Sequence, residues 1–465
     1  LESLEGRVVL SAAFETALGI GNDGGNIFPK DNAVDAAGNT YVAGYFSGSV
    51  DLDPAGDRPD GSDILTAQGT DDAFVAEYSP DNTLLWARRM GSDIVDTHLH
   101  EHGYALALDG AGNVYVTGDF LGSADFGPFL LTSSGNKDGF VAKLDAGGNF
   151  LWASRWGGAD DEVATAIAVD ATGNVLSAGE TATVPYPYTY SNNGFEVHKL
   201  SPTGAAVWSK RINAAMGSVG GLAADAAGNI FVAGDFRGTV DFNPDPKKSS
   251  TVNGAGGSAV NGYVLKLTAS GAFGWVAPLV AKTTTARVEC SDLALDTAGR
   301  IVVGGSYSGQ VDFNPNSRVD TRLPNLTSSD GFVLNLSSSG SLSWATPLDG
   351  AAVRSIALDG GGSVYATGDF AGVFTPGFGL SPVASNGGRD VFVTRLSASG
   401  TVSWATTIGG PSQDTAWAIT VDAAGAIYVA GNYASTVDFD PDPVDVHELT
   451  DTAGSDMFLL KLRQQ

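Results

Sequence analysis

The chain has 465 residues, a formal net charge of −27 and a single cysteine. Its 52 acidic residues outnumber its 25 basic residues, and because such a surface repels nucleic acid, we expect no nucleic-acid partner. No apolar stretch approaches the ~18 residues that a membrane span needs, so we expect no membrane span, and we expect a monomer. One cysteine excludes an intramolecular disulfide, and Cys290 is expected to be a small buried hydrophobic side chain.

A phrase of the form Asp-x-x-Gly-Asn, followed by a short apolar run that ends in Gly, recurs along the whole chain. Each copy continues through a loop to a segment like Phe-Val-x-Lys-Leu, and six copies then have a Trp after a small turn. Self-similarity at this period predicts a repeat architecture rather than several separate domains. The seven copies begin at Asp35, Asp109, Asp170, Asp225, Asp296, Asp359 and Asp422, and the tryptophans are Trp86, Trp152, Trp208, Trp275, Trp344 and Trp404.

Four strands are predicted in each copy from the alternation of apolar residues and from the turn residues between them. In the second copy these strands span residues 105–109, 114–118, 139–144 and 150–154. Glycines and aspartates between the strands favour tight hairpins. Seven such antiparallel units predict an all-β fold, a seven-bladed β-propeller. We expect this single domain over residues 13–465, preceded by an arm at residues 1–12.

The two ends of the chain are expected to complete the ring. The seventh copy ends at Leu462 without its Trp-containing strand. The missing piece is found at the N-terminus, where residues 14–19 align with residues 404–409 and place Phe14 at the Trp position. Because an open ring would leave unpaired sheet edges, we expect the N-terminal strand to pair with the C-terminal blade formed by residues 416–462.

The complete repeat resembles a known family. The pattern Asp-x-x-Gly-Asn-x-Tyr-Val-x-Gly, then Asp-x-Phe-Val-x-Lys-Leu, then Trp-Ala-x-x-x-Gly-Gly, is similar to the bacterial SBBP repeat, which is named for seven-bladed propellers. The resemblance extends from about residue 14 to residue 462, and the third copy departs most, at residues 183–190. It implies extracellular binding or surface roles and, because the family carries no single activity, no catalytic residues.

A shorter resemblance lies at residues 1–11, Leu-Glu-Ser-Leu-Glu-Gly-Arg-Val-Val-Leu-Ser. This segment is similar to the Leu-Glu-x-Arg-x-Leu-Leu-Ser segment near the N-terminus of planctomycete extracellular proteins, although Gly6 precedes Arg7 and Val9 replaces a leucine. It implies export, so we expect a secreted or cell-surface protein. The alternative is an ordinary polar N-terminal arm.

Four loops between the second and third strands of their copies share the pattern Val-Asp-x-[Asp/Asn]-Pro. Proline keeps the preceding residue extended, so oxygen side chains at alternate positions point the same way. Oxygen ligands at this spacing suit calcium and also begin an EF-hand loop, although the EF-hand glycine and bidentate glutamate are missing. The alternative is that the carboxylates cap turns and protect sheet ends. The expected calcium ligands are Asp51, Asp53, Asp57, Asp241, Asn243, Asp245, Asp312, Asn314, Asp438, Asp440 and Asp442, with Asp72, Asp330 or Asp456 joining if the loops fold back.

Three histidines lie close together in the segment that leads into the second copy. In an extended chain, His98, His100 and His102 project to one side, and this geometry can hold zinc or copper through the ring nitrogens. The alternative is a surface loop in which histidine is enriched by chance.

Two functions remain open at this point. The first is a secreted, calcium-binding propeller that acts as a binding module for a protein or polysaccharide partner. The second is a secreted lyase or hydrolase that acts on a glycan at the face of the propeller where the acidic loops lie. The first is favoured because the acidic patterns are spread over several copies, whereas an enzyme concentrates its chemistry in one place.

Overall fold

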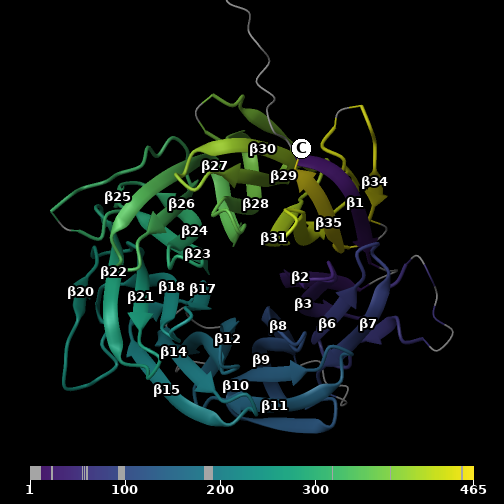
Figure 1. Ribbon diagram of the computed structural model, residues 1–465, viewed down its shortest axis with the longest axis horizontal. Helices are drawn as coiled ribbons and strands as arrows, with labels where there is room; N and C mark the ends of the chain where they lie inside the picture. Colours follow the sequence, from purple (N-terminus) through teal and green to yellow (C-terminus); the bar gives the residue numbers. More distant parts are fainter. Residues whose placement is uncertain are drawn as a thin grey trace, which may run out of the picture.

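A computed structural model describes residues 12–21, 25–54, 56, 58, 61–92, 100–182, 192–316, 318–377, 379–442, 444–451 and 454–464. Every regular element in these residues is a β-strand, and no described residue belongs to a helix. A search of the same residues for an apolar helix of membrane-spanning length finds none. Figure 1 shows the sheets arranged as a ring around a central axis, with the chain following the ring once. The expected all-β propeller with antiparallel blades is therefore confirmed.

Within the described ranges, four sheets have four strands each, and all their pairings are antiparallel. The strands of each sheet follow the order of the chain, except at β1, and the β4–β5 and β33–β34 hairpins are inserted between β3 and β6 and between β32 and β35. These sheets contain β2 (Asn26–Val34), β3 (Thr40–Ser47), β6 (Asp72–Tyr78) and β7 (Leu84–Met90); β8 (Glu101–Leu108), β9 (Val114–Phe126), β10 (Phe129–Leu144) and β11 (Phe150–Trp156); β12 (Asp161–Val169), β13 (Val175–Ala182), β14 (Asn192–Leu200) and β15 (Ala206–Asn213); and β31 (Thr415–Val421), β32 (Ile427–Tyr433), β35 (Asp456–Gln464) and β1 (Ala12–Ile20).

Two larger sheets and three short hairpins complete the described strands. The six-stranded sheet contains β16 (Ala215–Gly217), β17 (Gly221–Ala224), β18 (Ile230–Arg237), β21 (Asn261–Leu267), β22 (Phe273–Ala281) and β25 (Val311–Asp312). The seven-stranded sheet contains β23 (Arg287–Leu295), β24 (Ile301–Ser308), β26 (Asp330–Leu336), β27 (Leu342–Leu358), β28 (Val364–Thr375), β29 (Val383–Leu396) and β30 (Val402–Ile408). The hairpins pair β4 (Ser49–Asp51) with β5 (Ile64–Thr66), β19 (Thr239–Asp241) with β20 (Thr251–Asn253), and β33 (Thr436–Asp438) with β34 (Glu448–Thr450).

The hydrophobic core lies between neighbouring sheets. One cluster joins Tyr41 and Val75, from the sheet that begins with β2, to Val116 and Phe140 from the sheet that begins with β8. Burying apolar area between successive sheets is the main favourable term that holds such a ring together. Cys290 is buried in another of these clusters, as expected from its surroundings in the sequence.

The recurring tryptophans connect one sheet to the next. The indole Nε1 of Trp86, in β7, donates a hydrogen bond to the carbonyl oxygen of Ala146, in the β10–β11 turn, at 3.2 Å. Trp152 and Trp344 repeat this bond to the corresponding turns of the copies that follow them, each at 3.1 Å. The indole ring of Trp86 also packs so closely on Gly148 that a Cβ at this glycine would lie 2.5 Å from it. The repeated Trp is therefore paired with the turn glycine of the next copy.

Strand β1 lies beside β35, at the point in Figure 1 where the N-terminal purple meets the C-terminal yellow. The register differs from the sequence prediction, because Phe14 pairs with Leu462 and Thr16 pairs with Lys461. Trp404 occupies the position of Thr16 in its own sheet, where it pairs with Arg395. The expectation that Phe14 takes the Trp position is therefore wrong by two residues. The bulge at Glu15 has the same place as the bulge before Trp404, so it does not cause the shift. The alignment matched Gly19 with Gly409, whereas Gly21 is the glycine that lies against Asp456 as Gly409 lies against Asp390.

Replacement of Ile20 by Ala is expected to destabilise the protein by about 2–5 kcal/mol, because this side chain is fully buried where β1 packs on the core. Chemical denaturation followed by circular dichroism measures the change. Leu85→Ala is the control: Leu85 lies in β7 and is 42% exposed, so its loss should change stability by less than ~0.5 kcal/mol. Equal effects of the two substitutions would contradict a structural role for β1.

Candidate ligand-binding site in the axial cavity

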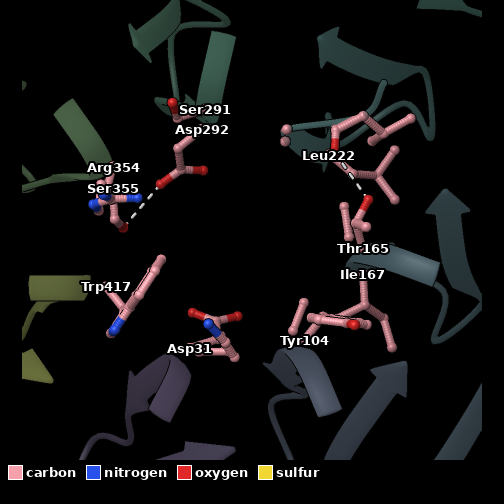
Figure 2. A pocket seen from close by; sticks show the side chains of 16 residues that line it. Asp31, Tyr104, Thr165, Ile167, Leu222, Ser291, Asp292, Arg354, Ser355 and Trp417 are labelled. Atoms are coloured by element: carbon pink, nitrogen blue, oxygen red, sulfur yellow. Dashed lines mark hydrogen bonds between the residues drawn. The ribbon is translucent and has the colours of Figure 1, made fainter. Parts of the chain in front are cut away.

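A cavity of about 400 Å³ lies on the axis of the ring. Its walls come from segments that are far apart in the sequence but successive around the ring, and Figure 2 shows labelled side chains from several of them surrounding one space. The contributing segments are β2, β8, β12, the residues just before and at the start of β17, β23, β27 and β31.

One residue of almost every lining strand is turned into this cavity by a β-bulge. Where β2 pairs with β3, the register passes from Pro29 directly to Asp31, so Lys30 has no partner. A bulge leaves its extra residue unpaired and directs that side chain away from the ladder. The same skip occurs in β8, β12, β23, β27 and β31, and all six skipped residues line the cavity: Lys30, Tyr104, Thr165, Ser291, Arg354 and Trp417.

Each bulge lies opposite the glycine that ends the repeated sequence phrase. A Cβ at Gly44 would lie 2.0 Å from the carbonyl oxygen of Phe28, and a Cβ at Gly431 would lie 2.2 Å from that of Thr415. Only glycine permits such an approach of two backbones, so this phrase residue is required for the bulge. Sequence reasoning missed the site, although a signal existed: every skipped residue lies five positions before the Asp that opens its phrase, as Lys30 does before Asp35.

Trp417 lies between two cations. The ammonium of Lys30 is 3.7 Å from the centroid of the indole ring, and the guanidinium carbon of Arg354 is 4.5 Å from it. Trp417 lies on β31, which contacts both β27, with Arg354, and β2, with Lys30, and Figure 2 shows Arg354 and Trp417 near each other at the cavity wall. The indole Nε1 donates to Asn432 Oδ1 at 2.9 Å, which fixes the ring. Burial and the charge of Arg354 together lower the pKa of Lys30 to about 8.

Two partly buried carboxylates on the cavity wall connect neighbouring strands. Asp31 accepts a hydrogen bond from the backbone N–H of Leu106, in β8, at 2.8 Å. Asp292 accepts one from the backbone N–H of Ile356, in β27, at 2.8 Å, and one from the hydroxyl of Ser355 at 3.0 Å (Figure 2). Burial raises the pKa of both carboxyl groups, that of Asp31 to about 7. The hydrogen bonds of Asp31 and Asp292 thus join neighbouring strands and stabilise the cavity wall.

The histidine segment lies beside this cavity. His100, just before β8, and His102, in β8, do project to the same side, with ring centroids 5.2 Å apart, whereas His98 lies outside the described residues. His102 Nδ1 is 2.9 Å from the hydroxyl oxygen of Tyr104 and 3.7 Å from Asp119 Oδ1. Burial alone would lower the pKa of His102, but its bonds to carboxylates outweigh burial and raise it, while burial and Lys137 lower the pKa of His100. Among the described residues, no group of three or more His, Cys, Asp or Glu side chains is placed to hold a metal, and zinc or copper binding stays a prediction.

The expected calcium loops form a ladder of turns. Asp438 Oδ1 accepts the backbone N–H of Asp440 at 3.1 Å, Asp440 Oδ1 accepts that of Asp442 at 2.9 Å, and Asp442 Oδ1 accepts that of Val444 at 2.9 Å. The residue between the acids is buried, as Phe439 is at 0% exposure, and it fixes the loop to the core. Such Asx-turns are the capping role considered above as the alternative. The same bonds occur from Asp51 to Asp53, along Asp241, Asn243 and Asp245, and along Asp312, Asn314 and Asn316, while Asp57 lies outside the described residues.

Two of the three expected fold-back ligands, Asp72 and Asp330, have other partners, whereas Oδ1 of Asp456 is buried without a hydrogen-bond partner among the described residues, and burial together with Asp451 raises the pKa of this carboxyl group to about 7. Asp72 forms an ion pair with Arg89 at 2.5 Å. Asp330 accepts hydrogen bonds from Leu326 and Thr327 in its own loop and from the backbone N–H of Gly350. Calcium binding stays a prediction from sequence.

The free energy of unfolding is expected to fall as the pH rises from 6 to 8. Burial raises the pKa of Asp31, Glu162 and Asp235 to about 7, and that of Glu101 to about 8. In the unfolded chain these groups titrate near pH ~4, so between these values the folded state binds more protons and acidification stabilises it. Melting temperatures at constant ionic strength measure the trend. Asp235→Asn, which keeps an acceptor for Ser218, should flatten it, and a melting temperature that rises towards pH 8 would contradict the assignment.

Comparison with known proteins shows only a distant sequence similarity. No protein-family model matches the chain. The chain is similar to the uncharacterized WD repeat-containing protein L264 of Acanthamoeba polyphaga mimivirus, with 23% identity over 367 residues, which are 65% of this chain and 26% of the viral protein. The chain thus spans about a quarter of the length of this curated relative. The resemblances to the SBBP repeat and to the planctomycete segment stay expectations.

Solved structures with a similar arrangement are remote in sequence. The C-terminal WD40 domain of Sif2 is 9% identical, with a TM-score of 0.46, over 97% of this chain and 98% of that chain. The Dos1 propeller is 10% identical, with a TM-score of 0.43, over 97% of this chain and 95% of that chain. A protein of unknown function from Dyadobacter fermentans DSM 18053 is 11% identical, with a TM-score of 0.39, over 79% of this chain and 96% of that chain.

Proposed function

We propose that this propeller is a binding module and that its axial cavity receives a small polar group presented by its ligand. The observation that carries the proposal is the convergence of six bulge residues, from strands spread over most of the chain, on one cavity. Bulges of this kind are enriched next to functional sites, because they redirect a side chain. A volume of about 400 Å³ is within the range of cavities that hold small ligands.

The chemistry of the wall supports recognition of a polar group. Hydroxyl-bearing residues, Tyr104, Thr165 and Ser291, come from three different strands, and Lys30 and Arg354 add positive charge on either side of Trp417. A few convergent polar groups on a concave surface are the usual composition of a specific binding site. Both a sugar unit of a polysaccharide and a side chain of a protein partner can present such a group.

Binding is favoured over lyase or hydrolase chemistry at this cavity by the state of its two carboxylates. Both oxygens of Asp31 accept backbone N–H bonds, from Asn32 and Leu106 at 2.8 Å each. The oxygens of Asp292 accept bonds from Leu293, Ser355 and Ile356. A general acid or base must be placed to reach the proton that it transfers, and these oxygens are held by hydrogen bonds within the strand and to the neighbouring strand.

The proposal includes a closed ring of seven blades as its frame. Strand β27 pairs with β26 through its first part and with β28 through its second, so the seven-stranded sheet is interpreted as two blades that share one long strand. Around the axis, β2, β8, β12, β17, β23, β27 and β31 contact one another in this order, and β31 contacts β2. The pairing of β1 with β35 adds the outer strand to the last blade.

The test is ligand-observed NMR with two sets of small probes, methyl glycosides of neutral and acidic sugars, and N-acetyl amino-acid amides. The parent protein is compared with Ser291→Trp, which fills the cavity from its wall, and with Ser399→Trp, which places the same ring in an exposed turn. We expect at least one probe to bind the parent and the Ser399 variant but not the Ser291 variant, with circular dichroism to confirm folding. Unchanged binding to Ser291→Trp, or no binding of any probe to the parent, would overturn the proposal.

A further inference from the structure

We infer that the group received in the axial cavity is a carboxylate and that the side chain of Lys30 is its principal partner. The inference rests on the proposed function and adds the chemical class of the ligand. It is carried by an imbalance of charge around Trp417, where positive side chains lie without enough carboxylate to match them.

The ammonium of Lys30 has aromatic rings as its neighbours. It lies 3.7 Å from the ring centroid of Trp417 and 5.3 Å from that of Tyr45, and among the described residues no carboxylate forms an ion pair with it. Other partly buried lysines of this chain have a carboxylate at short range: Lys137 with Asp119 at 3.0 Å, and Lys199 with Asp170 at 2.8 Å. Lys30 therefore differs from them in lacking a negative partner, and it is also the lysine that faces the axial cavity.

Arg354, on the other side of Trp417, is only partly neutralised. Its partner is the buried carboxylate of Asp369, which also receives the guanidinium of Arg389 through its second oxygen. One negative charge thus serves two arginines. The positive charge of Arg354 reaches Lys30, where it is one of the two causes that lower the pKa of the ammonium.

The carboxylates of the cavity wall do not correct this imbalance. Asp31 is the sequence neighbour of Lys30, but its oxygens are directed to the backbone N–H groups of Asn32 and Leu106. Asp292 lies on β23 and is bound to β27 by Ser355 and Ile356. Burial also disfavours the charged form of both carboxyl groups. The part of the cavity next to Trp417 is thus positive in a protein whose net charge is −27.

An incoming carboxylate would satisfy this site. A buried cation without a counter-charge is costly, and a charge-assisted hydrogen bond to an anion offsets that cost. Because Trp417 separates the two cations, the anion would contact the ammonium of Lys30 directly, while Arg354 contributes through its charge from the far side of the ring. Two sources present this chemistry in a small group, a uronic acid and an acidic side chain.

Isothermal titration calorimetry with three probes tests the inference. Methyl glucuronide and N-acetylglutamate amide carry the carboxylate, and methyl glucoside is the neutral match of the first. We expect at least one acid to bind, with the glucoside at least about tenfold weaker, a difference of about 1.4 kcal/mol. The acid that binds more tightly identifies the source of the carboxylate.

Variants of Lys30 assign the partner. Lys30→Met removes the charge at similar length and should weaken binding of the acid by about tenfold or more, whereas Lys30→Arg keeps a cation, guards against a folding defect and should bind the acid. Lys210→Met removes a lysine that lines a different cavity, and should leave binding unchanged. Binding of the acid to Lys30→Met with parental affinity, equal binding of the glucoside, or no binding of either acid at ~10 mM would overturn the inference. If Ser291→Trp abolishes binding but Lys30→Met does not, this inference fails while the proposed function stands.

Discussion

The contact on which the axial site depends is the approach of two backbones inside each blade. The carbonyl oxygen of Phe28, in β2, is so close to Gly44 that a Cβ on this glycine would lie 2.0 Å from it. The carbonyl oxygen of Thr415 approaches Gly431 in the same way at the other end of the chain. Any larger residue at the glycine would separate the strands and remove the bulge. Without the bulge, the skipped residue would rejoin the ladder and no longer line the cavity. The glycine of the repeated phrase, on the second strand of each copy, therefore does not line the candidate site but permits the bulge that directs a side chain into it.

The fold could be predicted from the sequence because its determinants are local and repeated. Alternation of apolar residues, the Asp-x-x-Gly-Asn turn and the Trp of the outer strand each recur, so an error in one copy is corrected by the others. The register of β1 could not be predicted in this way. Only one copy joins strands from the two ends of the chain, and its outer strand has Thr16 at the Trp position, so the nearby aromatic Phe14 gives a false match. The prediction of tight hairpins holds for the opening turn, where Asp35 Oδ1 accepts the backbone N–H groups of Ala37 and Asn39.

The candidate site could not be predicted, because its residues differ in every copy. Lys30, Tyr104 and Trp417 occupy equivalent positions but share no chemistry, so a search for recurring functional residues passes over them. The recurring residues are instead those of the Asp-x-[Asp/Asn]-Pro loops, whose side-chain oxygens accept backbone N–H groups of the same loop. In this ring of repeats, the repeated residues build the scaffold, whereas the position that differs from copy to copy supplies the side chains of the proposed binding site. The fixed spacing of five residues to the phrase Asp is the sequence signal that identifies this position.

The distribution of charge follows the same division. Aspartates such as Asp35 and Asp109 stabilise the hairpin turns: Oδ1 of each accepts two backbone N–H bonds. The positive side chains Lys30 and Arg354 are gathered at the axis. Salt screens exposed charges beyond about 8–10 Å, so a small anion inside the cavity responds mainly to these two cations and little to the distant turns. An anion still outside the ring is repelled by a protein whose net charge is −27, and this slows its approach at low ionic strength. The net negative charge therefore slows association, while the cations at the axis determine the affinity once the ligand has entered.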